Sequence, residues 1–406
     1  MVFSDIIEEL SKSSYSLWVG TRPPFDCINV DLLKSSNYRL STELHGKFDS
    51  VWLYESLLSD ISAWKYYLDE CIRLLNNRGH LIIRMQENAL LNIIQLKRFF
   101  YRNKLLSHVS IVYEGILEED NHRGSLAHER IMTVVFNVER KNYLIYNDKS
   151  WTFSILTQGN KVSNVERFCK SIRNNEKQHS EILIVGPRNS KYDKYDVVYI
   201  DNIYSEEYAE ISKKKNDILD VAANENILIA HDRFILGSDF FSGFDKYGYD
   251  FDFLTVNQFY ESGTIFPSFL TLGKRLAWSQ VYYFNDERIA DDNTFINGGL
   301  FVVKKTSARE VKLNPILYWN QGEDVEFSSA MLDHGICPRL NPFSTSITVG
   351  IDESYTSTFL PKENNISLDS NGNSLNLKRR ILIKLKKHVP LNLKLKIKSI
   401  IKGLLS

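Results

Sequence analysis

The sequence is poor in cysteine and lacks long hydrophobic runs. None of its four cysteines forms a Cys-x-x-Cys pair, which argues against a disulfide framework or a structural zinc site and favours a reducing compartment. No stretch approaches the roughly 18 apolar residues of a membrane-spanning helix. The first ten residues include Asp5, Glu8 and Glu9, where a signal peptide needs positive charge. We therefore expect a cytoplasmic protein without a spanning helix.

The composition provides enough apolar residues for more than one packed core. Hydrophobic residues make up 43% of the 406 residues, and aromatic residues make up 12%. A chain of this length exceeds the size at which a single core stops growing, so two domains are expected and three are possible. The pattern predicts one α/β unit over residues 1–147, a second over 148–360, and a linker with a basic tail over 361–406.

The net charge of zero hides an uneven distribution. Residues 378–406 hold ten Lys and Arg and no acid, so the rest of the chain holds 50 − 10 = 40 basic against 50 acidic side chains. If this tail is helical, one face carries Leu393, Ile397, Ile400, Ile401 and Leu404. That pattern is typical of a helix lying on a membrane surface, although strand-like alternation fits the same residues. We expect membrane docking; packing on the body or on a partner is the alternative, and the lack of aromatics disfavours nucleic acid.

Both predicted units alternate strands with helices. In the first, the strands SLWVG and SVWLYE precede a helix over residues 62–77 that Gly79 is expected to cap, and HLIIRM follows as a strand. In the second, the strands WTFSIL, EILIV, DVVYI and ILIAH are separated by helical segments. This order predicts two doubly wound, mostly parallel sheets, in which ligands bind outside the carboxyl ends of the strands.

Polar residues follow two strands of the second unit at that edge. Thr157, Gln158 and Gly159 end the first strand, and the apolar run ILIA leads directly into His231, Asp232 and Arg233. The order of elements, with a Lys-bearing helix before ILIAHDR, resembles the nucleotide-binding half of a GT-A glycosyltransferase, especially the inverting family 2. The resemblance places HDR on that family's metal-binding Asp-x-Asp motif, with His231 and Arg233 in the outer acidic positions.

Several roles are implied by this resemblance. A nucleotide-sugar donor would be bound, and Asp232 with His231 would hold Mn²⁺ or Mg²⁺ at its diphosphate. Arg233 would supply positive charge directly, which leaves the need for a metal open. The other donor-binding positions implied are Thr157, Gln158, Gly159, Arg188, Lys215 and Asn216.

A second match lies about ninety residues further on. FINGGLFVVKK and WNQGEDVEF resemble the Gly-Gly strand and the Trp-x-x-Gly-Glu-Asp-x-Glu segment of GT-A enzymes. The resemblance implies that Asp324 is the catalytic base and that Glu323 contacts sugar hydroxyls, since an inverting transfer needs one carboxylate to take the acceptor proton. It also implies that the donor meets Asn297, Gly298 and Gly299. For the acceptor we expect Asp250, Asp252 and Trp319; His334 and Arg339 are weaker candidates for the diphosphate.

The first unit has a resemblance of its own. FDSVWLYE to RGHLIIRM is similar to the later part of a class I S-adenosylmethionine methyltransferase, with Asp31 at the position that binds the cofactor ribose. Only Gly20 follows the first strand, no Gly-x-Gly is present, and the gap to Asp31 is too short for the intervening helix. We therefore expect a degenerate scaffold that does not methylate and for which S-adenosylmethionine is not the expected cofactor; an active methyltransferase and some other α/β unit are the alternatives.

The sequence thus predicts a bacterial-type hexosyltransferase at the inner face of the plasma membrane. It would move a sugar from a nucleotide donor to a glycan or lipid-linked acceptor, with inversion, in the synthesis of a surface polysaccharide such as O-antigen of lipopolysaccharide or capsule. Two alternatives remain: a bifunctional methyltransferase and glycosyltransferase, or a module that binds glycans or nucleotides without catalysis.

Overall fold

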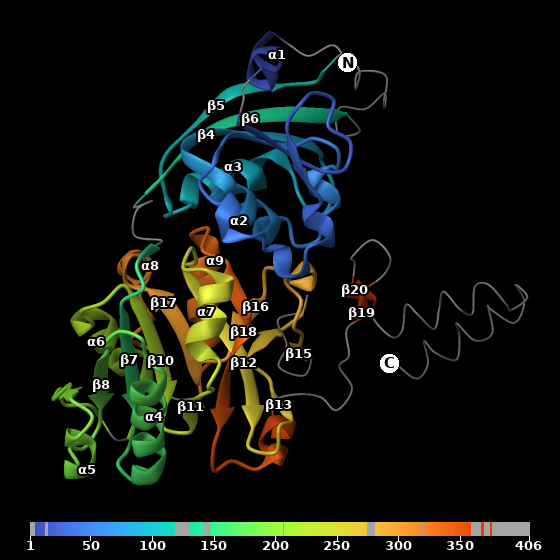
Figure 1. The fold of residues 1–406 in the computed structure, drawn as a ribbon. Helices are drawn as coiled ribbons and strands as arrows, with labels where there is room; N and C mark the ends of the chain where they lie inside the picture. Colours follow the sequence, from blue (N-terminus) through green and yellow to red (C-terminus); the bar gives the residue numbers. More distant parts are fainter. Residues whose placement is uncertain are drawn as a thin grey trace, which may run out of the picture.

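The computed structural model describes residues 5–12, 15–117, 130–141, 147–205, 207–273, 281–318, 320–358, 367–368 and 374–375. Two α/β units are visible in Figure 1, the first in blue and cyan and the second in green to orange. The chain passes between them after β6 (Ile131–Arg140) and before β7 (Trp151–Leu156). The predicted membrane-docking tail lies outside the described residues.

The first unit is built on a six-stranded sheet with the order β2-β1-β3-β4-β6-β5. β1 to β4 are parallel where they pair, and β6 runs antiparallel to both β4 and β5. The strands are β1 (Ser16–Val19), β2 (Ile28–Val30), β3 (Phe48–Leu53), β4 (Leu75–Gln86), β5 (Leu106–Gly115) and β6. The helices are α1 (Asp5–Ser11), α2 (Trp64–Leu74) and α3 (Ile93–Arg102).

Helix α2 ends earlier than the sequence suggests. The chain turns extended at Leu75, and Gly79 lies inside β4 opposite Val138 rather than capping the helix. A Cβ at Gly79 would lie 2.9 Å from the carbonyl oxygen of Asp49, so glycine serves a close approach of two strands here. The expected cap is therefore wrong.

The second unit is built on a nine-stranded sheet with the order β11-β18-β12-β17-β10-β7-β8-β9, and β13 pairs with β12. β10, β7, β8 and β9 are parallel, whereas β17 is antiparallel to β10. The predicted mixed α/β class with parallel strands is confirmed. The strands are β7, β8 (Glu181–Val185), β9 (Val197–Tyr199), β10 (Asn226–His231), β11 (Phe234–Leu236), β12 (Phe253–Tyr260), β13 (Ile265–Phe266), β17 (Leu300–Lys304) and β18 (Pro338–Thr348).

Both faces of this sheet are covered. Ile182 and Ile184 of β8 pack in one core with Phe168 of α4, while Leu183 packs in the other core with Ile218 of α6. The helices are α4 (Val162–Asn175), α5 (Ser190–Asp193), α6 (Ile211–Val221), α7 (Phe240–Tyr247), α8 (Lys305–Glu310) and α9 (Glu323–Asp333). No helix in the described part of the chain has the length and apolarity that a membrane crossing requires.

Shorter elements complete the described chain. β14 (Phe269–Thr271), β15 (Tyr282–Tyr283) and β16 (Thr294–Ile296) form a small sheet, and β19 (Ser367–Leu368) pairs with β20 (Ser374–Leu375). β16 leads directly into the Asn297-Gly298-Gly299 turn that precedes β17. The short 3-10 helices are η1 (Leu32–Lys34), η2 (Ser36–Tyr38), η3 (Thr42–Leu44), η4 (Leu58–Asp60), η9 (Glu287–Ile289) and η10 (Glu353–Thr358).

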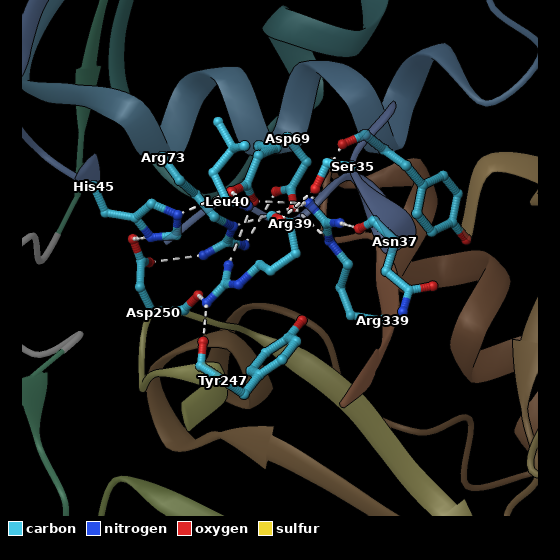
Figure 2. A network of polar contacts seen from close by, with 12 residues as sticks. Ser35, Asn37, Arg39, Leu40, His45, Asp69, Arg73, Tyr247, Asp250 and Arg339 are labelled. Atoms are coloured by element: carbon cyan, nitrogen blue, oxygen red, sulfur yellow. Dashed lines mark hydrogen bonds and ion pairs between the residues drawn. The ribbon is translucent and has the colours of Figure 1, made fainter. Parts of the chain in front are cut away.

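The two units meet through a buried ion network, shown in Figure 2. Arg73 of α2 contacts Asp250 at 2.8 Å and Asp252 at 2.5 Å, and Arg339 of β18 reaches back to Asp69 of α2 at 2.7 Å. The His45 ring lies between Glu70 at 2.9 Å and Asp250 at 3.0 Å. These contacts replace three sequence-based assignments: Asp250 and Asp252 bind arginines rather than acceptor hydroxyls, and Arg339 is committed to acids of the first unit rather than to a diphosphate.

Candidate active site

A cavity of about 330 Å³ opens at the carboxyl ends of β7 and β10. The two strands are parallel neighbours, with Leu156 opposite His231, so the polar residues that follow them meet at one edge of the sheet. Sequence reasoning assigned five residues of the lining to a donor site, namely Thr157, Gln158, His231, Asp232 and Arg233. It did not assign the other three polar residues of the lining, Asn160, Lys161 and Lys214. Their only signals were position after a strand end and membership of a lysine triplet that also suits a solvated helix face.

Asp232 is held on both sides of its carboxylate. The Thr157 hydroxyl donates to Oδ2 at 2.9 Å, and the Lys161 ammonium lies 3.5 Å from Oδ1. Asn164 of α4 donates to the Asp232 carbonyl at 3.0 Å, which fixes the backbone as the strand ends. Asp232 therefore has a defined orientation and a cationic neighbour.

His231 carries a neutral imidazole. Burial, reinforced by the nearby charges of Lys215 and Arg233, lowers its pKa well below the usual value. Its Nε2 atom is buried and has no hydrogen-bond partner among the described residues. The backbone N–H of His231 donates to the Gly299 carbonyl at 2.9 Å, which joins the end of β10 to the glycine turn before β17.

The glycine turn separates His231-Asp232-Arg233 from the acid pair of α9. A Cβ at Gly299 would lie 2.8 Å from Arg233 Nη2, and one at Gly298 would lie 2.9 Å from Asp324 Cβ. The Gly298 N–H donates to Asp324 Oδ2 at 2.9 Å. Two segments some ninety residues apart in sequence thus lie on opposite sides of one turn.

The side chain of Lys215 connects the glycine turn to helix α9. Its ammonium, which has no exposed surface, donates to the Gly298 carbonyl at 2.9 Å and contacts Glu323 Oε1 at 3.1 Å. It does not line the cavity, so it positions Glu323 and the turn rather than touching a donor. Asn297 has a similar structural part, because its Oδ1 accepts the Gly299 N–H at 2.9 Å.

Asp324 has the electrostatic character of a general base. Burial and the neighbouring Glu323 carboxylate raise its pKa to about 6, against the opposing effects of the Gly298 N–H and Lys215. The Val325 N–H donates to Oδ1 at 2.9 Å, so backbone donors orient both carboxylate oxygens. A carboxylate with a pKa close to neutral accepts a proton more readily than an ordinary aspartate and is still ionised at neutral pH.

The side chains present do not fit a divalent metal. Asp232 is the one carboxylate among the described residues that line the cavity, whereas Lys161, Lys214 and Arg233 line it with positive charge. The described residues contain no group of three or more His, Cys, Asp or Glu with the geometry to hold a metal ion. Mn²⁺ and Mg²⁺ favour several oxygen ligands with net negative charge. The expected ligation by Asp232 and His231 therefore lacks a suitable ligand set.

Two other predicted donor residues, Arg188 and Asn216, do not line the cavity. Arg188 pairs with Asp201 and its guanidinium lies 4.9 Å from the Tyr199 ring centre. The Asn216 amide donates to the Leu313 carbonyl at 2.8 Å and accepts the Leu313 N–H at 3.0 Å, so it joins α6 to the segment after α8.

Three other residues of the second unit were predicted to bind donor, diphosphate or acceptor, namely Gly159, His334 and Trp319. Gly159 adopts a φ of 84°, which favours glycine, and its N–H donates to Thr157 Oγ1 at 3.0 Å beside the cavity. His334 ends α9, and its ring contacts the Ala330 carbonyl at 2.7 Å, which is a structural bond rather than a diphosphate contact. Trp319, predicted to bind the acceptor, lies outside the described residues.

In the first unit, Glu55 lies against the loop that follows β1, where the sequence resemblance would place a glycine-rich motif. Its Oε2 accepts the N–H groups of Thr21 and Arg22 at 2.7 and 2.9 Å and the Trp18 indole N–H at 3.1 Å. Burial alone would raise the pKa of Glu55, but these bonds lower it to about 2. A Cβ at Gly20 would lie 2.2 Å from the same oxygen. The loop after β1 is therefore closed onto Glu55.

No family model and no curated protein matches the chain. Two solved structures are similar to about half of it. A crystal structure of GalNAc-T7 with UDP, GalNAc and Mn²⁺ matches over 50% of this chain and 44% of its own, with 13% identity and a TM-score of 0.39. A crystal structure of S. aureus TarS, residues 1–349, matches over 49% of this chain and 60% of its own, with 12% identity and a TM-score of 0.33. The chain spans less than two thirds of the length of either structure.

Proposed function

We propose that the second unit is a glycosyltransferase that moves a hexose from a nucleotide-sugar donor to an acceptor hydroxyl with inversion. The observation that carries this proposal is the glycine turn, which has Arg233 and the cavity on one side and the oriented Asp324 carboxylate on the other. A donor in the cavity would present its sugar toward the turn, and an acceptor would approach from the side of Asp324.

The donor is proposed to lie across the carboxyl ends of β7 and β10. A volume of about 330 Å³ falls within the range of small-ligand sites, roughly 300–1,000 Å³. Thr157 and Gln158 line the part of the cavity next to β7, where the nucleoside would bind. Arg233 lies closer to the glycine turn and would meet the diphosphate.

The proposed reaction is a single displacement. The acceptor hydroxyl oxygen forms a bond to the anomeric carbon while Asp324 takes its proton, and the bond from that carbon to the diphosphate oxygen breaks with its electron pair. The nucleoside diphosphate leaves as an anion. Glu323 is held by Lys215 beside Asp324 and keeps the base in a negative environment, which raises its proton affinity.

Asp324→Asn tests the assigned base. We expect the transfer rate to fall by about 10²–10⁴-fold, because the amide cannot take the proton, with little change in nucleoside diphosphate affinity measured by calorimetry. Asp333→Asn, an exposed acid at the other end of α9, is the matched control and should transfer normally. Transfer should be sought with a panel of nucleotide sugars, and unchanged turnover in Asp324→Asn would remove Asp324 as the base. Binding without turnover by the unmodified chain would favour the non-catalytic module.

We propose a glycan or lipid-linked acceptor at a membrane, in synthesis of a surface polysaccharide. This part rests on the basic, amphipathic sequence of residues 378–406. Membrane binding is measured by sedimentation with vesicles that contain anionic lipid, for chains with and without these residues. Equal sedimentation of the two chains would contradict membrane docking by the tail.

A further inference from the structure

We infer that this site binds the diphosphate of its donor with its own cations, Lys161, Lys214 and Arg233, and requires no divalent metal for binding or for transfer. The inference rests on the proposed function, because it concerns the leaving group of the same donor. It assigns to side chains the charge that a metal would otherwise supply when the bond to the diphosphate breaks.

The first support is the charge of the cavity lining. Among the described residues of the lining, three are cationic, Lys161, Lys214 and Arg233, and one, Asp232, is anionic. A cleft of one sign concentrates the opposite charge, so this lining attracts an anionic diphosphate and repels a free dication. Lys161 immediately precedes α4, Lys214 lies on α6 and Arg233 lies two residues after β10, so three segments of the chain meet at one cavity.

The second support is the state of Asp232. The Thr157 hydroxyl and the Lys161 ammonium approach different oxygens of its carboxylate, at 2.9 and 3.5 Å. A metal on this carboxylate would lie next to the Lys161 ammonium and would compete with it. Asp232 is thus better placed to orient a lysine toward the phosphates than to bind a dication.

The third and independent support is Arg233. Its guanidinium carbon lies 5.3 Å from the ring centres of both Phe234 and Tyr355, and among the described residues no carboxylate forms an ion pair with it. Its Nε atom is buried without a hydrogen-bond partner in the same part of the chain. Aromatic rings hold an arginine in place without neutralising it. A planar guanidinium fixed in this way at a cavity is suited to a phosphate, which it binds through paired N–H donors.

The contrast with other arginines supports this assignment. Arg188 pairs with Asp201, Arg167 with Glu261 at 3.1 Å, and Arg73 with three acids. These side chains already have anionic partners in the protein. Arg233 is the arginine of the cavity lining, and it faces a volume in which an anion would complete its contacts.

The decisive experiment measures binding of UDP, GDP, CDP and ADP to the full chain by calorimetry, in EDTA and in Mn²⁺ or Mg²⁺. We expect one or more of them to bind in EDTA with an affinity within about twofold of that with metal, and to bind more weakly as salt rises. Lys161→Met, at a half-exposed side chain, and Arg233→Met should each weaken binding about tenfold or more. Arg167→Met, on the exposed face of α4, is the control and should bind normally. Circular dichroism of each variant checks that it is folded.

A charge reversal sharpens the test. Arg233→Asp places a second carboxylate beside Asp232 and removes a cation, so binding should become weak in EDTA and recover with Mn²⁺. Transfer by the unmodified chain should persist in EDTA. Binding by the unmodified chain only with metal would overturn this inference and leave the proposed function standing. Failure of every nucleoside diphosphate to bind under any condition would overturn both.

Discussion

Lys215 is a fully buried lysine next to the glycine turn, and it does not line the cavity. Sequence reasoning assigned it to the donor, because it lies on the helix that leads to ILIAHDR. Its side chain instead runs under the glycine turn, where burial of the charge is compensated by Glu323 and by the Gly298 carbonyl. A buried charge without such partners is costly. Lys215 therefore contacts Glu323 directly and lowers the pKa of Asp324.

Removal of this ammonium should shift the acid side of the pH profile. In the unmodified chain, burial and Glu323 raise the pKa of Asp324 to about 6, so under the proposed mechanism kcat/KM should be constant above that pH and should fall about tenfold per unit below it as the base is protonated. Lys215 lowers that pKa. In Lys215→Met the acid side should therefore move to higher pH, and the free energy of unfolding should fall by about 3–5 kcal/mol, because Glu323 loses its buried partner.

The dependence of kcat/KM on pH measures the shift, and unfolding in urea measures the loss of stability. Lys213→Met is the matched control, because Lys213 lies on the same helix with an exposed side chain. If the pH profile of Lys215→Met is not shifted, Lys215 does not affect the protonation of Asp324, even if the variant is less stable.

At the scale of elements, the turn between β16 and β17 decides the geometry of the site. Asn297 closes the turn, the Gly299 carbonyl accepts from His231, and the Gly298 N–H donates to Asp324. The sequence predicted both the glycine pair and the acid pair through a resemblance. Their direct contact depends on how α9 packs against β16, which the Ile296 N–H and the Ser328 hydroxyl join at 3.2 Å.

Gly298→Ala should lower kcat by about 10²-fold while the protein still folds. The new Cβ would lie 2.9 Å from Asp324 Cβ and 3.0 Å from Glu323 Oε1, so the acid pair must move by a few tenths of an ångström or more. Small misplacements of reacting groups have effects of this size. Single-turnover rates with a saturating donor measure the loss. Ser329→Ala changes one side-chain atom on the exposed side of α9 and is the control, which should react at the normal rate. Normal turnover in Gly298→Ala would show that the acid pair does not depend on this close approach.

At the scale of the whole molecule, the ion network and the candidate site lie at opposite ends of the same strand. β17 begins after the glycine turn and ends at Lys304, whose N–H donates to the Asp252 carbonyl at 2.8 Å. A strand of five residues spans roughly 15 Å. Figure 1 shows the first unit at one end of the second. Because β17 separates the ion network from the glycine turn, the first unit packs at the end of this strand away from that turn.

This arrangement predicts that breaking the ion network destabilises the protein without changing the site. Arg73→Met leaves Asp69, Asp250 and Asp252 buried with fewer cations, so the free energy of unfolding should fall by about 3–5 kcal/mol. Glu261→Gln, which removes the exposed pair with Arg167, should cost less than about 1 kcal/mol. Below the unfolding transition, nucleoside diphosphate affinity should match that of the unmodified chain. A large loss of affinity in folded Arg73→Met would couple the network to the site.

The sequence by itself determined the local features of this protein. The order of strands and helices, the polar residues at the ends of β7 and β10, and the glycine turn follow from patterns within a few residues, because strand and helix periodicity and turn preferences are local. The basic character of residues 378–406 is likewise a property of composition.

Only the tertiary structure decided which charges meet. In sequence, Asp250 and Asp252 form an alternating pair of acids that is equally compatible with a solvated loop or a ligand site. In the structure both bind Arg73, which lies 177 and 179 residues away in sequence. In the same way, Lys161 and Lys214 become a site only when α4 and α6 bring them to Arg233. The partner of a charged side chain is set by contacts between distant segments, and those contacts are fixed by packing rather than by local preference.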